Sequence, residues 1–138
     1  MSSYSSSPRG GGRSFTQAIE ICLRNYAGFE GRAPRSELWY FVLACLLAGI
    51  AVGFVGGVFN AILGVRWVGN LFSGVLDLAI FLPSIAVNVR RLHDIDKSGW
   101  WYFVVFIPLI GWIIMLVWFC TRGSYGTNRF GRDPLSEY

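Results

Sequence analysis

An apolar run without a charged side chain extends from Leu38 to Leu63 and constrains this sequence more than any other feature. A helix that crosses the roughly 30 Å hydrocarbon core of a membrane needs about 20 residues. The run exceeds that length. Trp39 and Tyr40 stand at its start, where amphipathic aromatic rings mark a boundary between membrane and water. The run therefore predicts a first membrane-spanning helix over 38–63.

The composition of the whole chain supports a membrane protein. Of 138 residues, 54% are hydrophobic and 14% are charged, and a small soluble domain cannot bury so much apolar surface. The net charge of +4 would suit nucleic acid, but the Lys and Arg residues stand in short flanks between apolar runs rather than on one face. We therefore expect lipid around the chain and no nucleic-acid partner.

A second apolar run, over 71–87, is interrupted by Pro83 and contains Asp77. Proline kinks a membrane helix without ending it, because neighbouring groups satisfy the carbonyl that loses its hydrogen bond. We therefore predict a second span over 71–87. A short connection over 64–70 precedes it, and a charged loop over 88–99 follows it.

A third apolar run, over 100–120, begins at Trp100 and Trp101 and carries Pro108 and Gly111 near its middle. These breaks allow either one kinked span or a re-entrant hairpin that returns to the side from which it came. We favour the kinked span. The predicted fold class is then an all-α integral membrane protein, a small helical bundle of about three transmembrane helices.

The amino-terminal region predicts a helix that does not span the membrane. Ser14 with Gln17 three positions later has the form of a capping box, and apolar residues follow at helical spacing. Such an amphipathic helix is expected in the membrane interface or packed on the cytosolic ends of its own bundle. The chain thus divides into a disordered tail over 1–13, the amphipathic helix over 14–28, the membrane domain over 29–134 and a tail over 135–138.

The orientation follows from the Lys and Arg residues on each side of three spans, because cytoplasmic flanks carry the excess. The amino-terminal side carries eight and the other side four. They are Arg9, Arg13, Arg24, Arg32, Arg35, Arg90, Arg91 and Lys97 against Arg66, Arg122, Arg129 and Arg132. The amino terminus is therefore predicted to be cytoplasmic.

Two features inside the spans are candidates for function. Gly49, Gly53 and Gly57 form a stripe of small residues, which lets another helix approach closely. The stripe is either a dimer face or, as we favour, a contact with the protein's own second or third span. Asp77 would be costly in lipid. It either relays protons or balances a cation, or, as we favour, faces Ser73 and the interior of the bundle.

Polar residues also gather where the first two spans end on the predicted cytoplasmic side. These residues are Arg32, Arg35, Glu37, Arg90, Arg91, His93 and Asp94. Cations are in excess, so an anionic lipid headgroup is one expected partner. The other interpretation, which we favour, is structural, with Arg35 paired to Glu37 or Arg91 to Asp94. No metal is expected, because a lone histidine without a second His or Cys lacks the usual ligand set.

Four motifs carry a resemblance to a known family. They are FEGRAPRSELW at 29–39, RRLHD at 90–94 with SGWW at 98–101, IPLIGW at 107–112 and NRFGRDP at 128–134. In this order and spacing the chain resembles the YhaH-like small inner-membrane proteins, a bacterial family of unknown function numbered eight-zero-five. The resemblance implies a bacterial inner-membrane protein of a few spans, but no activity. Asp77 lies outside these motifs.

The sequence therefore predicts a multi-pass protein of the bacterial inner membrane without an enzymatic role. No catalytic motif or cofactor motif is present. Membrane lipids, among them lipids with anionic headgroups, and a second copy of the chain are the expected partners. The alternative is a small transporter or channel-like subunit that uses Asp77 and the glycine stripe.

Overall fold

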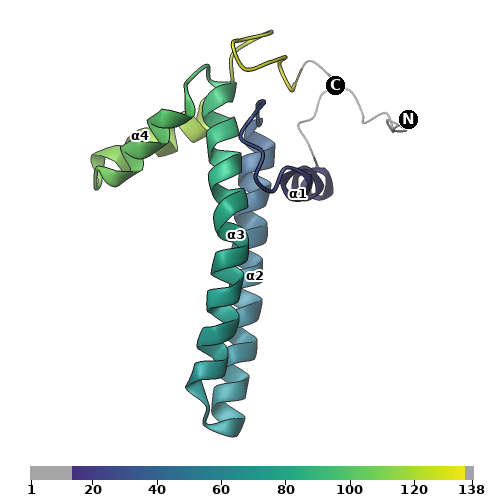
Figure 1. Ribbon diagram of the computed structural model, residues 1–138, viewed down its shortest axis with the longest axis vertical. Coiled ribbons are helices and arrows are strands. Elements are labelled where there is room, and N and C mark those ends of the chain that lie inside the picture. Colours follow the sequence, from purple (N-terminus) through teal and green to yellow (C-terminus); the bar gives the residue numbers. More distant parts are fainter. Residues whose placement is uncertain (1–13, 136–138) are drawn as a thin grey trace.

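The computed structural model describes residues 14–135 and is built of helices, which confirms the all-α class for that part of the chain. In chain order these are α1 (Phe15–Arg24), α2 (Arg35–Leu63), α3 (Arg66–Asp94), the 3-10 helix η1 (Gly99–Phe106) and α4 (Ile110–Cys120). Figure 1 shows α2 and α3 side by side as a long hairpin, with α1 across one side of it and α4 projecting on the other. The predicted tail over 1–13 and residues 136–138 lie outside the described residues.

The α2–α3 hairpin supplies two candidate membrane spans. Each helix has 29 residues, which gives a length of about 43 Å and exceeds the hydrocarbon core. The most apolar windows of α2 and α3 are only 11% and 17% buried, so neither is the core helix of a soluble domain. The first two predicted spans therefore correspond to helices that are long and apolar enough to cross a membrane.

The tip of the hairpin is tighter than the predicted connection over 64–70. Only Gly64 and Val65 separate the two helices, and Gly64 adopts the left-handed conformation (φ 65°) that glycine favours at a helix end. Close to the tip the two backbones touch, since a Cβ on Gly56 would stand 2.9 Å from the Cα of Gly69. This crossing point fixes how the two helices are aligned.

Helix α3 continues past the predicted end of the second span, so the predicted loop over 88–99 is wrong in its first half. Pro83 lies inside the helix and cannot donate to the carbonyl of Ala79. The hydroxyl of Tyr26 donates to that carbonyl instead. Because the freed acceptor has a donor, the helix runs unbroken to Asp94 and carries the RRLHD motif on its last turns.

The third apolar run forms a hairpin, and the prediction of one kinked span over 100–120 is wrong. The chain reverses at Pro108 and Leu109, where Leu109 has a φ of 63°. The two arms touch, since Trp112 Nε1 donates to the Val105 carbonyl at 3.0 Å and the rings of Trp101 and Trp118 meet edge to face. Helix α4 is about 16 Å long, too short to span. The third transmembrane helix is therefore not confirmed.

Helix α1 begins as predicted and ends earlier. Ser14 Oγ accepts from the Gln17 backbone N–H and Gln17 Oε1 accepts from the Ser14 N–H, which confirms the capping box. The helix ends at Arg24 rather than near residue 28. At this end the side-chain amide group of Asn25 donates to the Ile21 carbonyl.

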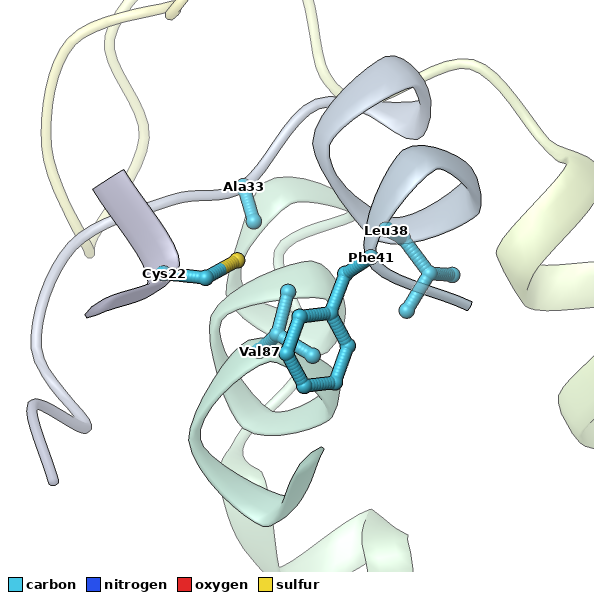
Figure 2. Close-up of a cluster of buried hydrophobic side chains, with 5 residues drawn as sticks. All are labelled: Cys22, Ala33, Leu38, Phe41 and Val87. Atoms are coloured by element: carbon cyan, nitrogen blue, oxygen red, sulfur yellow. The ribbon is translucent and has the colours of Figure 1, made fainter. Parts of the chain in front are cut away.

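A small apolar core joins α1 to the base of the hairpin, the end where α2 begins and α3 ends. Its buried members are Cys22, Ala33, Leu38, Phe41 and Val87, drawn together in Figure 2. They come from α1, the segment before α2, and α2 and α3 themselves. This core holds the polar residues around it in fixed positions.

Candidate functional site

The structure brings the predicted polar residues together at the base of the hairpin. The segment before α2 runs beside the end of α3, where the Ala33 N–H donates to the Arg90 carbonyl at 3.0 Å. We call Arg32, Glu37, Arg90, Arg91 and Asp94 the base cluster. All five residues are buried.

Asp94 lies at the centre of the base cluster between two guanidinium groups. Arg32 Nε donates to Asp94 Oδ1 at 2.9 Å, and Arg91 Nη1 donates to Oδ2 at 2.6 Å. The three side chains are at most 3% exposed. One carboxylate cannot balance two cations, so further acceptors are needed.

The missing acceptors come from the last turn of α4 and from the segment that follows it. Arg32 donates to the carbonyls of Ser124 and Gly126 at 2.6 and 2.7 Å. Arg91 donates to the carbonyls of Trp118 and Thr121. Carbonyl groups at the end of a helix have no N–H donor within the helix, so they are available to Arg91. The carboxyl-terminal segment is therefore fastened to the same end of the hairpin as α1.

A second ion pair joins three helices. Arg90 of α3 donates to Glu37 of α2 at 2.5 Å, with side chains 4% and 0% exposed. The thiol of Cys22 of α1 lies 3.7 Å from the same carboxylate oxygen. Glu37 thus pairs with Arg90 and not, as the structural alternative proposed, with Arg35. The other proposed pair, Arg91 with Asp94, is present.

The remaining two predicted residues have separate roles. His93 stacks on Phe130 with ring centroids 3.9 Å apart, and its Nδ1 lies 3.0 Å from the Gly31 carbonyl oxygen. Arg35 is exposed and donates to the Cys120 carbonyl. Of the predicted cations, Arg35 is the one that solvent or a lipid headgroup can reach.

Sequence reasoning did not assign a role to the NRFGRDP motif, which docks the carboxyl-terminal segment. The Asn128 amide group donates to the His93 carbonyl, Phe130 covers the His93 ring, and Asp133 accepts from the Gly126 N–H. A side chain at Gly123 would collide with the Asp94 carboxylate. The only sequence signal for these contacts was the resemblance itself.

The glycine stripe does not pack against the protein's own helices, so the favoured prediction for it is wrong. A Cβ on Gly49, Gly53 or Gly57 would meet no atom within 4 Å in the described chain. The hairpin crosses instead at Gly56 and Gly69, and within residues 14–135 no third span covers the stripe. The reading as a dimer face stays a prediction.

Asp77 is exposed on the surface of α3, contrary to the prediction that it faces the bundle interior. Among residues 14–135 no hydrogen bond or ion pair engages its side chain. Arg66, Asn70, Ser73 and Asp77 recur at helical spacing and form one stripe on α3. The first three line a groove of about 420 Å³ that Gly53, Gly57 and Asn60 line from α2. We call this set, extended by Gly49, the polar face.

The fold and the two polar regions can be compared with known proteins. A family model described as "Protein of unknown function (DUF805)" matches residues 26–132. The chain belongs to the DUF805 family. Inner membrane protein YhaI of Escherichia coli K12 is 46% identical over 112 residues, which cover 81% of this chain and 90% of YhaI. Inner membrane protein YhaH of the same strain is 44% identical over 117 residues, covering 83% and 93%. No solved structure matches.

The matched range shows which elements of this chain correspond to the family model. It covers α2, α3, η1, α4 and the carboxyl-terminal segment up to residue 132, and it begins after α1. Every residue of the base cluster lies inside it. The resemblance seen in the motifs is thus confirmed, and the family description states no activity.

Proposed function

We propose that this DUF805 protein is a non-enzymatic protein of the bacterial inner membrane whose polar face binds a second copy of the chain. The observation that carries the proposal is Asp77, an exposed carboxyl group on a helix that is long and apolar enough to span. An acid at such a depth is expensive when it meets lipid.

Membrane insertion as a multi-pass hairpin is supported by the relatives and by the charges. YhaI and YhaH are named as inner membrane proteins. Of the Lys and Arg residues within the described range 14–135, Arg66 alone lies at the tip, and the others lie on α1, at the base or on the segments beside it. Cytoplasmic flanks carry such an excess, so the base, with the amino terminus, is assigned to the cytoplasm. Helix α1 and the η1–α4 hairpin then lie along the interface.

The depth of Asp77 follows from two interfacial tryptophans. Trp67 marks the tip, and Trp39 marks the base. Counting along both helices from the Gly56–Gly69 contact places Trp39 level with Ala86. Asp77 is then about 15 Å from either marker, in the middle of the span.

A second copy suits the polar face better than another kind of helix does. In a parallel two-fold pair, residues at equal depth meet their own copies. Asn70 amides and Ser73 hydroxyls can both donate and accept, so each can pair with itself. Two Asp77 carboxyl groups that share a proton can do the same. The open glycines allow the backbones to approach closely.

The mass of the protein in lipid nanodiscs tests the proposal. We expect a dimer for the unaltered chain and a monomer for Gly53→Leu, because a branched side chain separates the faces. Leu78→Ala is the matched control, since Leu78 is 75% exposed and next to Asp77. A monomeric unaltered chain contradicts the proposal, as does a Gly53→Leu variant that is still a dimer.

A second candidate, a transporter or channel-like subunit, is favoured by the groove of about 420 Å³. Polar side chains line that groove from the tip inward and lead toward Asp77. Proton flux in proteoliposomes that disappears in Asp77→Asn would support this role. Flux equal to that of empty liposomes would remove it.

Lipid binding at the base is proposed only through Arg35, because Arg32, Arg90 and Arg91 are buried in ion pairs. Native mass spectrometry of Arg35→Ala should show less retained phosphatidylglycerol than Arg24→Ala. Equal retention by the two variants would exclude Arg35 as a headgroup site.

A further inference from the structure

A second cavity, of about 560 Å³, lies at the base between α3 and η1. Its size is typical of small-molecule sites, which are mostly apolar with a few placed polar groups. The aromatic side chains that line it are Phe29, Trp100, Tyr102, Phe103 and Phe130. Phe29 precedes α2 in the sequence and Phe130 lies on the carboxyl-terminal segment, so docking of that segment completes the wall of the cavity.

His93 is the polar group that the fold fixes in the wall of this cavity. Its Nδ1 faces the Gly31 carbonyl at 3.0 Å, and a carbonyl can only accept, so Nδ1 carries the proton. In the neutral imidazole Nε2 is then an acceptor. Nε2 points toward Gly99, another lining residue, and lies 3.8 Å from where a Cβ there would stand. Stacking on Phe130 prevents the ring from turning away.

Gly99 lets η1 lie close against α3 beside this acceptor. A Cβ on Gly99 would stand 2.9 Å from Val89 Cγ1, so a larger residue would push η1 away from α3. Trp100 and Trp101 are both exposed, and exposed tryptophans favour the membrane interface, where the orientation proposed above puts this region. A molecule dissolved in the lipid can therefore reach the cavity without crossing the base cluster.

We infer that this cavity binds a lipid-soluble phenol or hydroquinone whose hydroxyl group donates to His93 Nε2. Aromatic walls favour a flat ring, which can stack on them or meet them edge to face. An acyl chain would fill the same space but leave the imidazole acceptor without a donor, and an unpaired buried acceptor is costly. The inference does not depend on self-association through the polar face.

A matched pair of probes tests the hydroxyl group without altering the protein. Binding of 4-butylphenol and of butylbenzene to the protein in nanodiscs is followed at pH 8 by tryptophan fluorescence. Affinities are expressed per mole of probe in the bilayer, with empty nanodiscs subtracted. Because a hydrogen bond formed away from water is worth about a factor of ten, the phenol should bind about tenfold more tightly. Equal affinities, or no saturable binding of the phenol, would overturn the inference.

Two variants on η1 locate the site. Phe103 lines the cavity, whereas Phe106 lies on the same helix, is 73% exposed and does not line it. We expect Phe103→Ala to weaken 4-butylphenol binding at least fivefold, the loss of one aromatic contact, and Phe106→Ala to leave it unchanged. Both residues are exposed, so neither change should unfold the protein. Equal effects of the two variants would place the probe elsewhere and overturn the inference.

Discussion

Removal of either partner of the Glu37–Arg90 pair should destabilise the protein strongly, whereas removal of both should not. The two side chains are 0% and 4% exposed and 2.5 Å apart. Charges this close attract by about 4 kcal/mol or more even at an effective dielectric constant of 20. Each ion has also lost its hydration, so Glu37→Leu or Arg90→Met alone leaves an uncompensated buried charge. Each should lower the free energy of unfolding by about 3–5 kcal/mol.

The double variant Glu37→Leu with Arg90→Met tests the reasoning, because two apolar side chains of similar volume need no partner. Its stability should lie within about 1 kcal/mol of the unaltered chain or above it. Unfolding is followed by circular dichroism in mild detergent with added denaturant. The exposed pair Arg129–Asp96, with side chains 63% and 47% exposed, is the control and should contribute about 0–1 kcal/mol. Additive losses in the double variant would refute the account of the pair.

Three further predictions concern the hairpin. Gly56→Leu should lower the free energy of unfolding by about 1–3 kcal/mol, because the new side chain forces the backbone of α2 away from Gly69. Gly57→Leu is the control and should not alter the stability of the monomer. Equal losses for the two variants in a thermal melt would contradict the contact between Gly56 and Gly69. Tyr26→Phe removes the donor to the Ala79 carbonyl and should lower the free energy of unfolding by about 1 kcal/mol. This loss should vanish in a Pro83→Ala background, because the backbone N–H at position 83 can then donate to the same carbonyl. A loss that persists in that background would contradict the pairing of Tyr26 with Ala79. Cysteines at Val68 and Thr127 should be labelled from opposite sides of the membrane by an impermeant maleimide, because the tail returns to the base; labelling from one side would contradict the hairpin topology.

Local signals in the sequence were sufficient to predict several helical elements and one contact between residues far apart in the chain. The capping box of Ser14 and Gln17 needs only neighbouring residues, and the apolar run over 38–63 needs only length. The meeting of Arg32 with Asp94 follows from an antiparallel pair of helices, whose ends must lie together.

Features that depend on distant contacts could not be predicted in this way. The run over 100–120 has the composition of a span, and the hydrogen bonds that join Trp118 and Gly126 to Arg91 and Arg32 in the reversed chain connect residues far apart in the sequence. The same segment covers the arginines, so their burial was also not visible in the sequence. The sequence predicted that the second span continues past Pro83, but it did not show that Tyr26, far away in the chain, donates to the freed Ala79 carbonyl. Gly56 makes the close contact with α3 although it does not belong to the stripe of Gly49, Gly53 and Gly57, so equal spacing alone did not identify the packing glycine.

The central claim is that the polar face of one copy of the chain contacts the polar face of a second copy. Disulfide formation between two copies tests this claim most directly. Ser73→Cys lies on the polar face and Val75→Cys, 59% exposed, lies two positions away on α3, each in a background with Cys45 and Cys120 replaced by Ser. Two positions along a helix separate side chains by about 200°, so only one of them can face the partner. Oxidation in native membranes should link Ser73→Cys into a dimer and leave Val75→Cys monomeric. Crosslinking through Val75→Cys but not Ser73→Cys, or through neither, would contradict the claim.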